Sequence, residues 1–181
     1  MNKMATPSSM REAFAVLNKM KDDGIFEKYA VGGAVASSIH LEPTTTADVD
    51  IFVTLKPHPG KLILSLESVY DYLLRKGANK DGQYIVYAGW PMQFLSSDTS
   101  PLVAEAVDNA QEFEADNLSV WVIAPEYLGA IALEVGRSKD KVRLNALMKS
   151  GILDMRKFKG MIRRHGLEKK YAEWLKWQKT F

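Results

Sequence analysis

The sequence contains no cysteine among its 181 residues. Disulfide bonds, thiolate metal sites and cysteine nucleophiles are therefore excluded, and the composition fits a reducing compartment, so we expect a cytoplasmic protein. No run of about 18 apolar residues occurs, and the N-terminal segment has no apolar stretch suited to a signal peptide. The three histidines lie far apart in sequence and form no zinc-binding motif.

An excess of one charge is also missing. Lysine and arginine number 24 and aspartate and glutamate 22, which leaves a formal net charge of +2. Overall charge therefore does not call for a nucleic-acid or membrane partner. Hydrophobic residues make up 46% of the chain, enough for a sizeable core, and the length suits one domain with a helical appendage.

Segments typical of strands and helices alternate through the first two thirds of the chain. We expect helices over 8–24, 34–41, 62–77 and 101–113, and strands over 26–31, 47–55, 83–97 (two strands joined near Gly89) and 118–124. From Pro125 onward the pattern is helical. The sequence therefore predicts a mixed α/β core over 1–124, with a C-terminal helical region over 125–181 packed on it.

Two aspartates interrupt the apolar strand expected over 47–55. Because residues i and i+2 of a strand share a face, Asp48 and Asp50 should lie side by side, about 7 Å apart, while Val49, Ile51 and Val53 point into the core. Two carboxylates this close repel each other. Water at an exposed strand end would offset the repulsion, and so would Mg²⁺, which prefers carboxylate oxygens and substrate phosphates.

A glycine pair, Gly32-Gly33, lies between a short strand and the next expected helix. Glycine lets the backbone approach a ligand closely, and a helix N-terminus suits a phosphate group. A tight turn that simply needs small residues is the alternative. Together, the glycine turn and the aspartates on the following strand would supply both halves of a metal–nucleotide site.

These residues, followed by Arg137-Ser138-Lys139-Asp140, resemble the signature of the nucleotidyltransferase superfamily, which has a polymerase-β-like fold. The chain is most similar to the small bacterial members that include abortive-infection (AbiE-like) toxins, and the ordered match runs from about 29 to 147. The resemblance implies a mixed-sheet nucleotidyltransferase fold with a C-terminal helical layer. It also implies Mg²⁺-dependent transfer of a nucleoside monophosphate from an NTP to an acceptor hydroxyl.

The resemblance also implies residue roles. Asp48 and Asp50 would be catalytic and would bind one or two Mg²⁺ or Mn²⁺ ions, and Gly32 and Gly33 would hold the triphosphate. The acceptor could be RNA, a protein or a small molecule, and a small antitoxin is a possible protein partner. No membrane partner is expected.

The later block, residues 137–140, would supply positive charge near the phosphates. By resemblance Lys139 would neutralise them, helped by Arg137 or Arg143. These cations fall within two helical turns, and a triphosphate needs such a cluster. A solvated basic helix face is the alternative. Asp140 could instead pair locally with a neighbouring base.

One position departs from the family pattern. Gln93 stands where active members carry a third catalytic carboxylate on a later strand. An amide oxygen can coordinate a metal, but it brings no charge and cannot act as a general base. Either another acid replaces it, Asp98 or Glu105, or the protein is a catalytically impaired binding or regulatory module that transfers slowly or not at all.

A weaker alternative is RNA binding through the basic tail over 156–179. Phe158, Tyr171, Trp174 and Trp177 are interleaved with its bases and could stack on nucleotides. However, Tyr171, Trp174 and Leu175 have the i, i+3, i+4 spacing of a helix face that packs into a core.

Overall fold

Seven strands form one sheet in the order β3-β4-β5-β2-β1-β7-β6. The structure is a computed structural model that describes residues 8–41, 48–56, 65–115 and 117–180. The strands are β1 Lys28–Val31, β2 Val49–Thr54, β3 Asn79–Asp81, β4 Tyr84–Tyr87, β5 Trp90–Ser96, β6 Gln111–Ala115 and β7 Leu118–Val122. Because β2 runs parallel to β5, and β1 to β7, while the other neighbours are antiparallel, the sheet is mixed as predicted.

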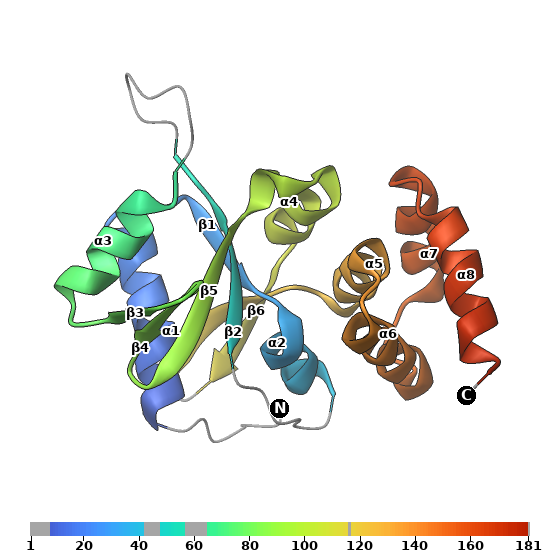
Figure 1. The fold of residues 1–181 in the computed structure, drawn as a ribbon, viewed down its shortest axis with the longest axis horizontal. Helices are drawn as coiled ribbons and strands as arrows, with labels where there is room; N and C mark the ends of the chain where they lie inside the picture. Colours follow the sequence, from blue (N-terminus) through green and yellow to red (C-terminus); the bar gives the residue numbers. More distant parts are fainter. Residues whose placement is uncertain (1–7, 42–47, 57–64, 116, 181) are drawn as a thin grey trace.

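Helices cover both faces of the sheet (Figure 1). They are α1 Ser8–Asp22, α2 Gly33–His40, α3 Glu67–Arg75, α4 Pro101–Asp108, α5 Pro125–Val135, α6 Ser138–Ser150, α7 Met155–Arg164 and α8 Glu168–Gln178, with a 3-10 turn, η1, at Ser97–Thr99. Helices α1 and α3 lie on one face and α2 and α4 on the other. Helices α5 to α8 form a further layer beyond α2 and α4.

Strand β2 has the predicted alternation. Val49, Ile51 and Val53 are fully buried on the face that α1 and α3 cover. Asp50 points to the opposite face, toward α2, and Phe52 shares that face with it. The apolar pattern around the aspartates therefore decides which face of the sheet they reach.

The helix expected over 101–113 is too long and is corrected by the structure. It ends at Asp108, and the next residues form β6, which pairs with β7 in a hairpin. Pairing with β7 outweighs the helical pattern, and Phe113 packs edge-on against the His40 ring at 5.2 Å between centroids. Strand β3 was not anticipated. Helix α3 begins at Glu67, and positions 62–64 of its expected range lie outside the described residues.

The C-terminal region is helical as expected. Trp174 is 2% exposed, stacks on Tyr171, and donates its indole N–H to the Lys141 carbonyl at 3.2 Å. Phe158 is fully buried. Base stacking by Phe158 and Trp174, on which the RNA-binding alternative partly rested, is therefore not supported. The boundary at residue 124 stays a prediction, since α5 contacts both the earlier α2 and α4 and the later helices.

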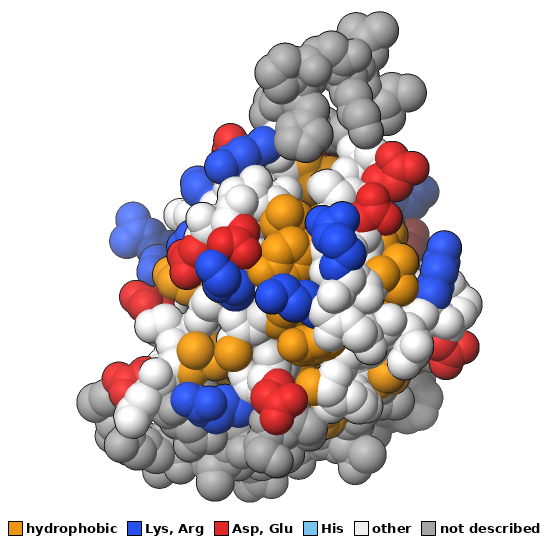
Figure 2. Space-filling view, turned by 90° about the vertical axis from the view of Figure 1, so that its left-hand side faces the viewer, with side chains coloured by type: hydrophobic (Ala, Val, Ile, Leu, Met, Phe, Trp, Pro, Cys, Tyr) orange, Lys and Arg blue, Asp and Glu red, His pale blue; other side chains and the backbone are white. Residues whose placement is uncertain are grey.

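Surface charge is mixed on the face that Figure 2 shows, which is the left-hand side of Figure 1 over α3. Lysine and arginine alternate there with aspartate and glutamate around patches of hydrophobic side chains. This agrees with the small net charge. Within the described ranges, no helix has both the length and the apolar character needed to cross a membrane.

Candidate active site

The glycine turn is attached directly to Asp50. The Gly32 N–H donates to the Asp50 carbonyl at 2.9 Å. Gly33 follows with a φ of +58°, and a Cβ there would lie 1.9 Å from Oδ2 of Asp50. Only glycine meets both conditions, because other residues rarely adopt this backbone conformation and any side chain would collide with the carboxylate. The Asp50 carboxylate therefore lies against the start of α2.

Position 32 requires a small residue for a different reason. Its backbone is extended, and a Cβ would lie 2.5 Å from the Phe52 ring. Contact with Phe52 therefore accounts for glycine at position 32, while Gly33 borders the carboxylate. The first intrahelical bond of α2 is donated by the Ala36 N–H to the Gly32 carbonyl at 3.1 Å. The preceding N–H groups of the first turn have no acceptor within the helix.

The pKa of Asp50 is shifted from its ordinary value. Burial raises the pKa of Asp50, the nearby Asp48 raises it further, and Arg143, Lys139 and Arg137 act in the opposite direction. Among the described residues Asp50 forms no salt bridge, so these cations act on it through space. Helix α6, about ninety residues further along the chain, therefore brings the predicted cations close enough for their charges to act on Asp50.

Asp140 organises the first turn of α6. It is 1% exposed and accepts hydrogen bonds from the Arg137 N–H at 3.2 Å and from Arg137 Nε at 2.7 Å. Arg143 contacts its other oxygen at 3.4 Å. The structure thus shows the local pairing of Asp140 with neighbouring bases that the sequence left open. By binding both guanidinium groups, Asp140 fixes two of the three predicted cations, while Lys139 is exposed.

Gln93 lies on β5, the strand next to β2. In the parallel pair of β2 and β5 it lies opposite Asp50, and Val49 lies opposite Met92. The buried Val49 and Met92 define the covered face, so Gln93 and Asp50 share the other one. Within the described part of the chain, no group of three or more histidine, aspartate or glutamate side chains is arranged to hold a metal ion.

The suggested replacements for the third carboxylate are wrong. Asp98 lies in η1, and the adjacent Ser97 hydroxyl is 3.1 Å from that of Thr54, at the opposite end of β2 from Asp48. Glu105, on α4, binds the Tyr127 hydroxyl and the side chains of Arg164 and His165. Because β2 and β5 run parallel, residues beyond the end of β5 are carried away from the aspartates.

Sequence reasoning missed Tyr84. Its hydroxyl donates to Oδ2 of Asp48 at 3.2 Å, so the site includes a phenol from β4. The sequence predicted two strands joined near Gly89 but not their register. In the structure Ala88 and Gly89 form a two-residue turn with positive φ at both positions, which fixes the hairpin register. Continued along β4 and β5, that register sets Tyr84 opposite Gln93.

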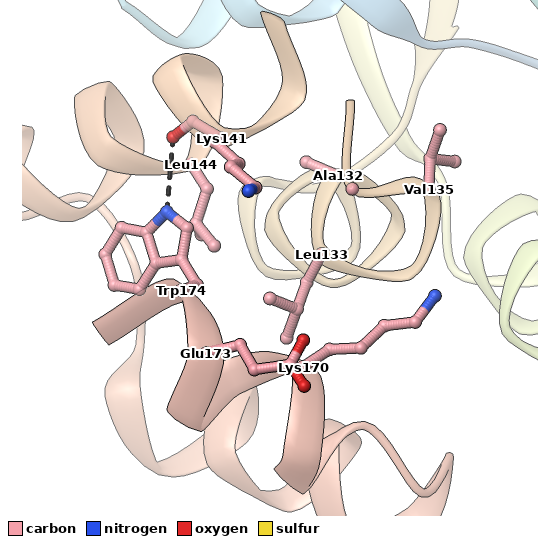
Figure 3. A pocket seen from close by; sticks show the side chains of 9 residues that line it. Ala132, Leu133, Val135, Lys141, Leu144, Lys170, Glu173 and Trp174 are labelled. Carbon is pink, nitrogen blue, oxygen red and sulfur yellow. Dashed lines mark hydrogen bonds between the residues drawn. The ribbon is translucent and has the colours of Figure 1, made fainter. Parts of the chain in front are cut away.

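A separate pocket of about 240 Å³ lies among α5, α6 and α8 (Figure 3). Leu133, Leu144 and Trp174 form its apolar part, and Lys141, Lys170 and Glu173 bring charges to it. None of the predicted site residues lines it. It is therefore a crevice of the helical layer, distinct from the aspartate site.

Comparison with solved structures places this arrangement in a fold. A nucleotidyltransferase-like protein of Paracoccidioides brasiliensis, described as antigenic, superposes with a TM-score of 0.60 at 13% identity, covering 95% of this chain and 94% of that one. A candidate nucleotidyltransferase of Thermotoga maritima gives 0.50 at 13% identity, covering 82% and 98%. The antibiotic-resistance factor ANT(2'')-Ia gives 0.52 at 12% identity, covering 94% and 99%.

The chain therefore has the nucleotidyltransferase fold, as the motif order predicted. No protein-family model and no curated protein sequence matches it. At 12–13% identity these likenesses establish the fold alone. The narrower similarity to abortive-infection toxins stays a prediction.

Proposed function

We propose that the protein is a Mg²⁺-dependent nucleotidyltransferase, which moves a nucleoside monophosphate from an NTP to an acceptor hydroxyl. One observation carries the proposal: three separate parts of the chain act on the Asp50 carboxylate. They are the glycine turn at the start of α2, which borders the Asp50 carboxylate, Asp48 just before β2, and the cations of α6, whose charges oppose the rise in the pKa of Asp50. A structural role alone does not require this convergence of opposite charges beside a positive-φ glycine.

The donor set fits a hard divalent ion. Asp48 and Asp50 would supply carboxylate oxygens and Gln93 an amide oxygen, which are ligands that Mg²⁺ or Mn²⁺ accepts. When bound, such an ion stabilises negative charge that develops on the transferring phosphoryl group. Gly33 also leaves no side chain between the aspartate and the first turn of α2, where a phosphate would meet backbone N–H groups.

The cations of α6 would bind the phosphates. Asp140 holds Arg137 and Arg143 in place, which reduces the ordering needed when a triphosphate binds. In the reaction, a bond forms between the acceptor oxygen and the α-phosphorus. The bond to pyrophosphate breaks with its electron pair, and the hydroxyl proton passes to water because Gln93 cannot accept it.

A second candidate is a nucleotide-binding protein that transfers slowly or not at all. The observation in its favour is Gln93 opposite Asp50, with Glu105 occupied elsewhere. By its resemblance to toxin–antitoxin members, such a protein could work with a small antitoxin. Co-expression of a neighbouring gene product that relieves growth arrest would test that role.

Thermal melting with Mg²⁺ and each NTP tests binding. At ligand near 100 times its Kd the native state gains about 2.7 kcal/mol, or about 5–11 °C in Tm. We expect this shift in the wild type and its loss in the double variant Asp48→Asn, Asp50→Asn. A wild type without a Mg²⁺-dependent shift, or a double variant with an equal one, would refute the proposed site.

Incubation with α-labelled NTPs in cell extract, followed by a search for label on RNA, protein and small molecules, tests transfer. Gln93→Asp should strengthen metal binding and raise transfer, because it adds a negative charge and a base opposite Asp50. It should lower stability without metal, since a third carboxylate joins the repulsion. A wild type that transfers well, and is unchanged or inactivated by Gln93→Asp, would remove the impaired alternative and this role for Gln93.

A further inference from the structure

Tyr84 belongs to the same row of side chains as Gln93 and Asp50. Asp50 lies opposite Gln93 across β2 and β5. In the antiparallel pair of β4 and β5, Ile85 lies opposite Met92, so the next residue, Tyr84, lies opposite Gln93. Three neighbouring strands thus present a phenol, an amide and a carboxylate in one row on one face.

The hydroxyl of Tyr84 reaches beyond its own row. It donates a hydrogen bond to Oδ2 of Asp48 at 3.2 Å, and Asp48 lies two residues before Asp50, just ahead of β2. A hydrogen bond to a carboxylate is stronger than one between neutral groups and restricts how the carboxylate can rotate. Tyr84 therefore influences the direction in which Asp48 presents its oxygens.

We propose that Tyr84 is a positioning residue for metal binding, acting through Asp48. This inference rests on the proposed function, since it concerns the same aspartates. With the neutral Gln93 in the third position, the two aspartates supply all the negative charge of the donor set. Their orientation then decides metal affinity, and groups that orient metal ligands typically contribute 10–100-fold to affinity.

The test measures Mn²⁺ binding, with no need for an acceptor or for turnover. Free Mn²⁺ is followed by its electron paramagnetic resonance signal during titration in the presence of an NTP analogue with a non-hydrolysable α–β bridge. We expect Tyr84→Phe, which removes only the hydroxyl, to weaken Mn²⁺ binding about tenfold. Tyr87→Phe is the matched control, because it makes the same change three residues along β4, on the opposite face.

Tyr84→Ala, checked for folding by circular dichroism, completes the set and should bind no better than Tyr84→Phe. A wild type that binds no Mn²⁺ with the analogue would overturn the proposed function and this inference with it. Normal binding by wild type and by Tyr84→Phe overturns the role of Tyr84 alone, even if Tyr84→Ala binds weakly, because the ring would then act only by packing. Equal losses in Tyr84→Phe and Tyr87→Phe would likewise point to strand stability and overturn it.

Discussion

Two carboxylates of this protein lie in opposite situations. Glu105 belongs to a cluster with Tyr127, Arg164 and His165, which we call the Glu105 cluster. It accepts hydrogen bonds from Tyr127 at 2.9 Å and from Arg164 Nε at 3.3 Å, and its Oε2 lies 2.8 Å from His165 Nε2. Asp50, in contrast, forms no ion pair with a described residue and lies against a glycine.

The pKa values move in opposite directions for this reason. Burial acts to raise the pKa of Glu105, but hydrogen bonds from Arg164, Tyr127 and His165 outweigh it, so the pKa is lowered. Burial and Asp48 raise the pKa of Asp50. The charge of Glu105 is satisfied within the fold, and its hydrogen bonds join helices α4, α5 and α7. The negative charge of Asp50 has no such partner among the described residues. It therefore costs stability and marks a place where a ligand can supply positive charge.

The largest effect should follow from Gly33→Ala. An alanine would be strained at a φ of +58°, and its Cβ would strike the Asp50 carboxylate. We therefore expect a loss of about 2 kcal/mol in the free energy of unfolding. The Mg²⁺–nucleotide shift in Tm should disappear as well. The control is Gly151→Ala, at a φ of +72° with nothing within 4 Å, which should lose about 1 kcal/mol and keep the shift. Identical behaviour of the two variants would show that Gly33 does not constrain Asp50.

Glu105→Gln should have an intermediate effect, lowering stability at pH 7 by about 1–2 kcal/mol because Arg164 and His165 lose their charged partner. Since folding lowers the pKa of Glu105, its contribution is present above the ordinary value of 4.5 and is lost as pH falls through the folded value. Denaturant unfolding across this range should show the two proteins converging in acid. Nucleotide binding should be unchanged, and the exposed Glu112→Gln should change neither property. A loss of nucleotide binding in Glu105→Gln would break the contrast between the two carboxylates.

The smallest effect, of opposite sign, should follow from Asp50→Asn without metal. Because folding raises the pKa of Asp50, the charged form destabilises the folded state. The variant should therefore be more stable, by up to about 1 kcal/mol or about 2–4 °C. The gain should grow as pH rises from the ordinary value of 3.8 through the raised one, then stay constant. Destabilisation at neutral pH would mean that protein groups already compensate the charge.

Much of the site could be predicted because its signals are local. The alternation of Val49, Ile51 and Val53 gave the face on which Asp50 lies, and the order of the motifs gave the fold. Other parts could not be predicted, because they depend on partners distant in sequence. Residues 111–113 have a helical pattern, yet they form β6 through pairing with β7. The side chains of Arg164 and His165 that contact Glu105 come from the end of α7, about sixty residues further along the chain.

By itself, the sequence determined the strand periodicity, the glycine turn, a turn near Gly89 and the absence of cysteine chemistry. These features depend on backbone conformations and on neighbours within a few residues. Only the tertiary structure decided that Gln93 lies opposite Asp50, that Asp140 holds Arg137 and Arg143, and that α6 approaches β2. Such contacts join segments tens of residues apart. They are set by packing of the whole sheet and its helices, which no local pattern encodes.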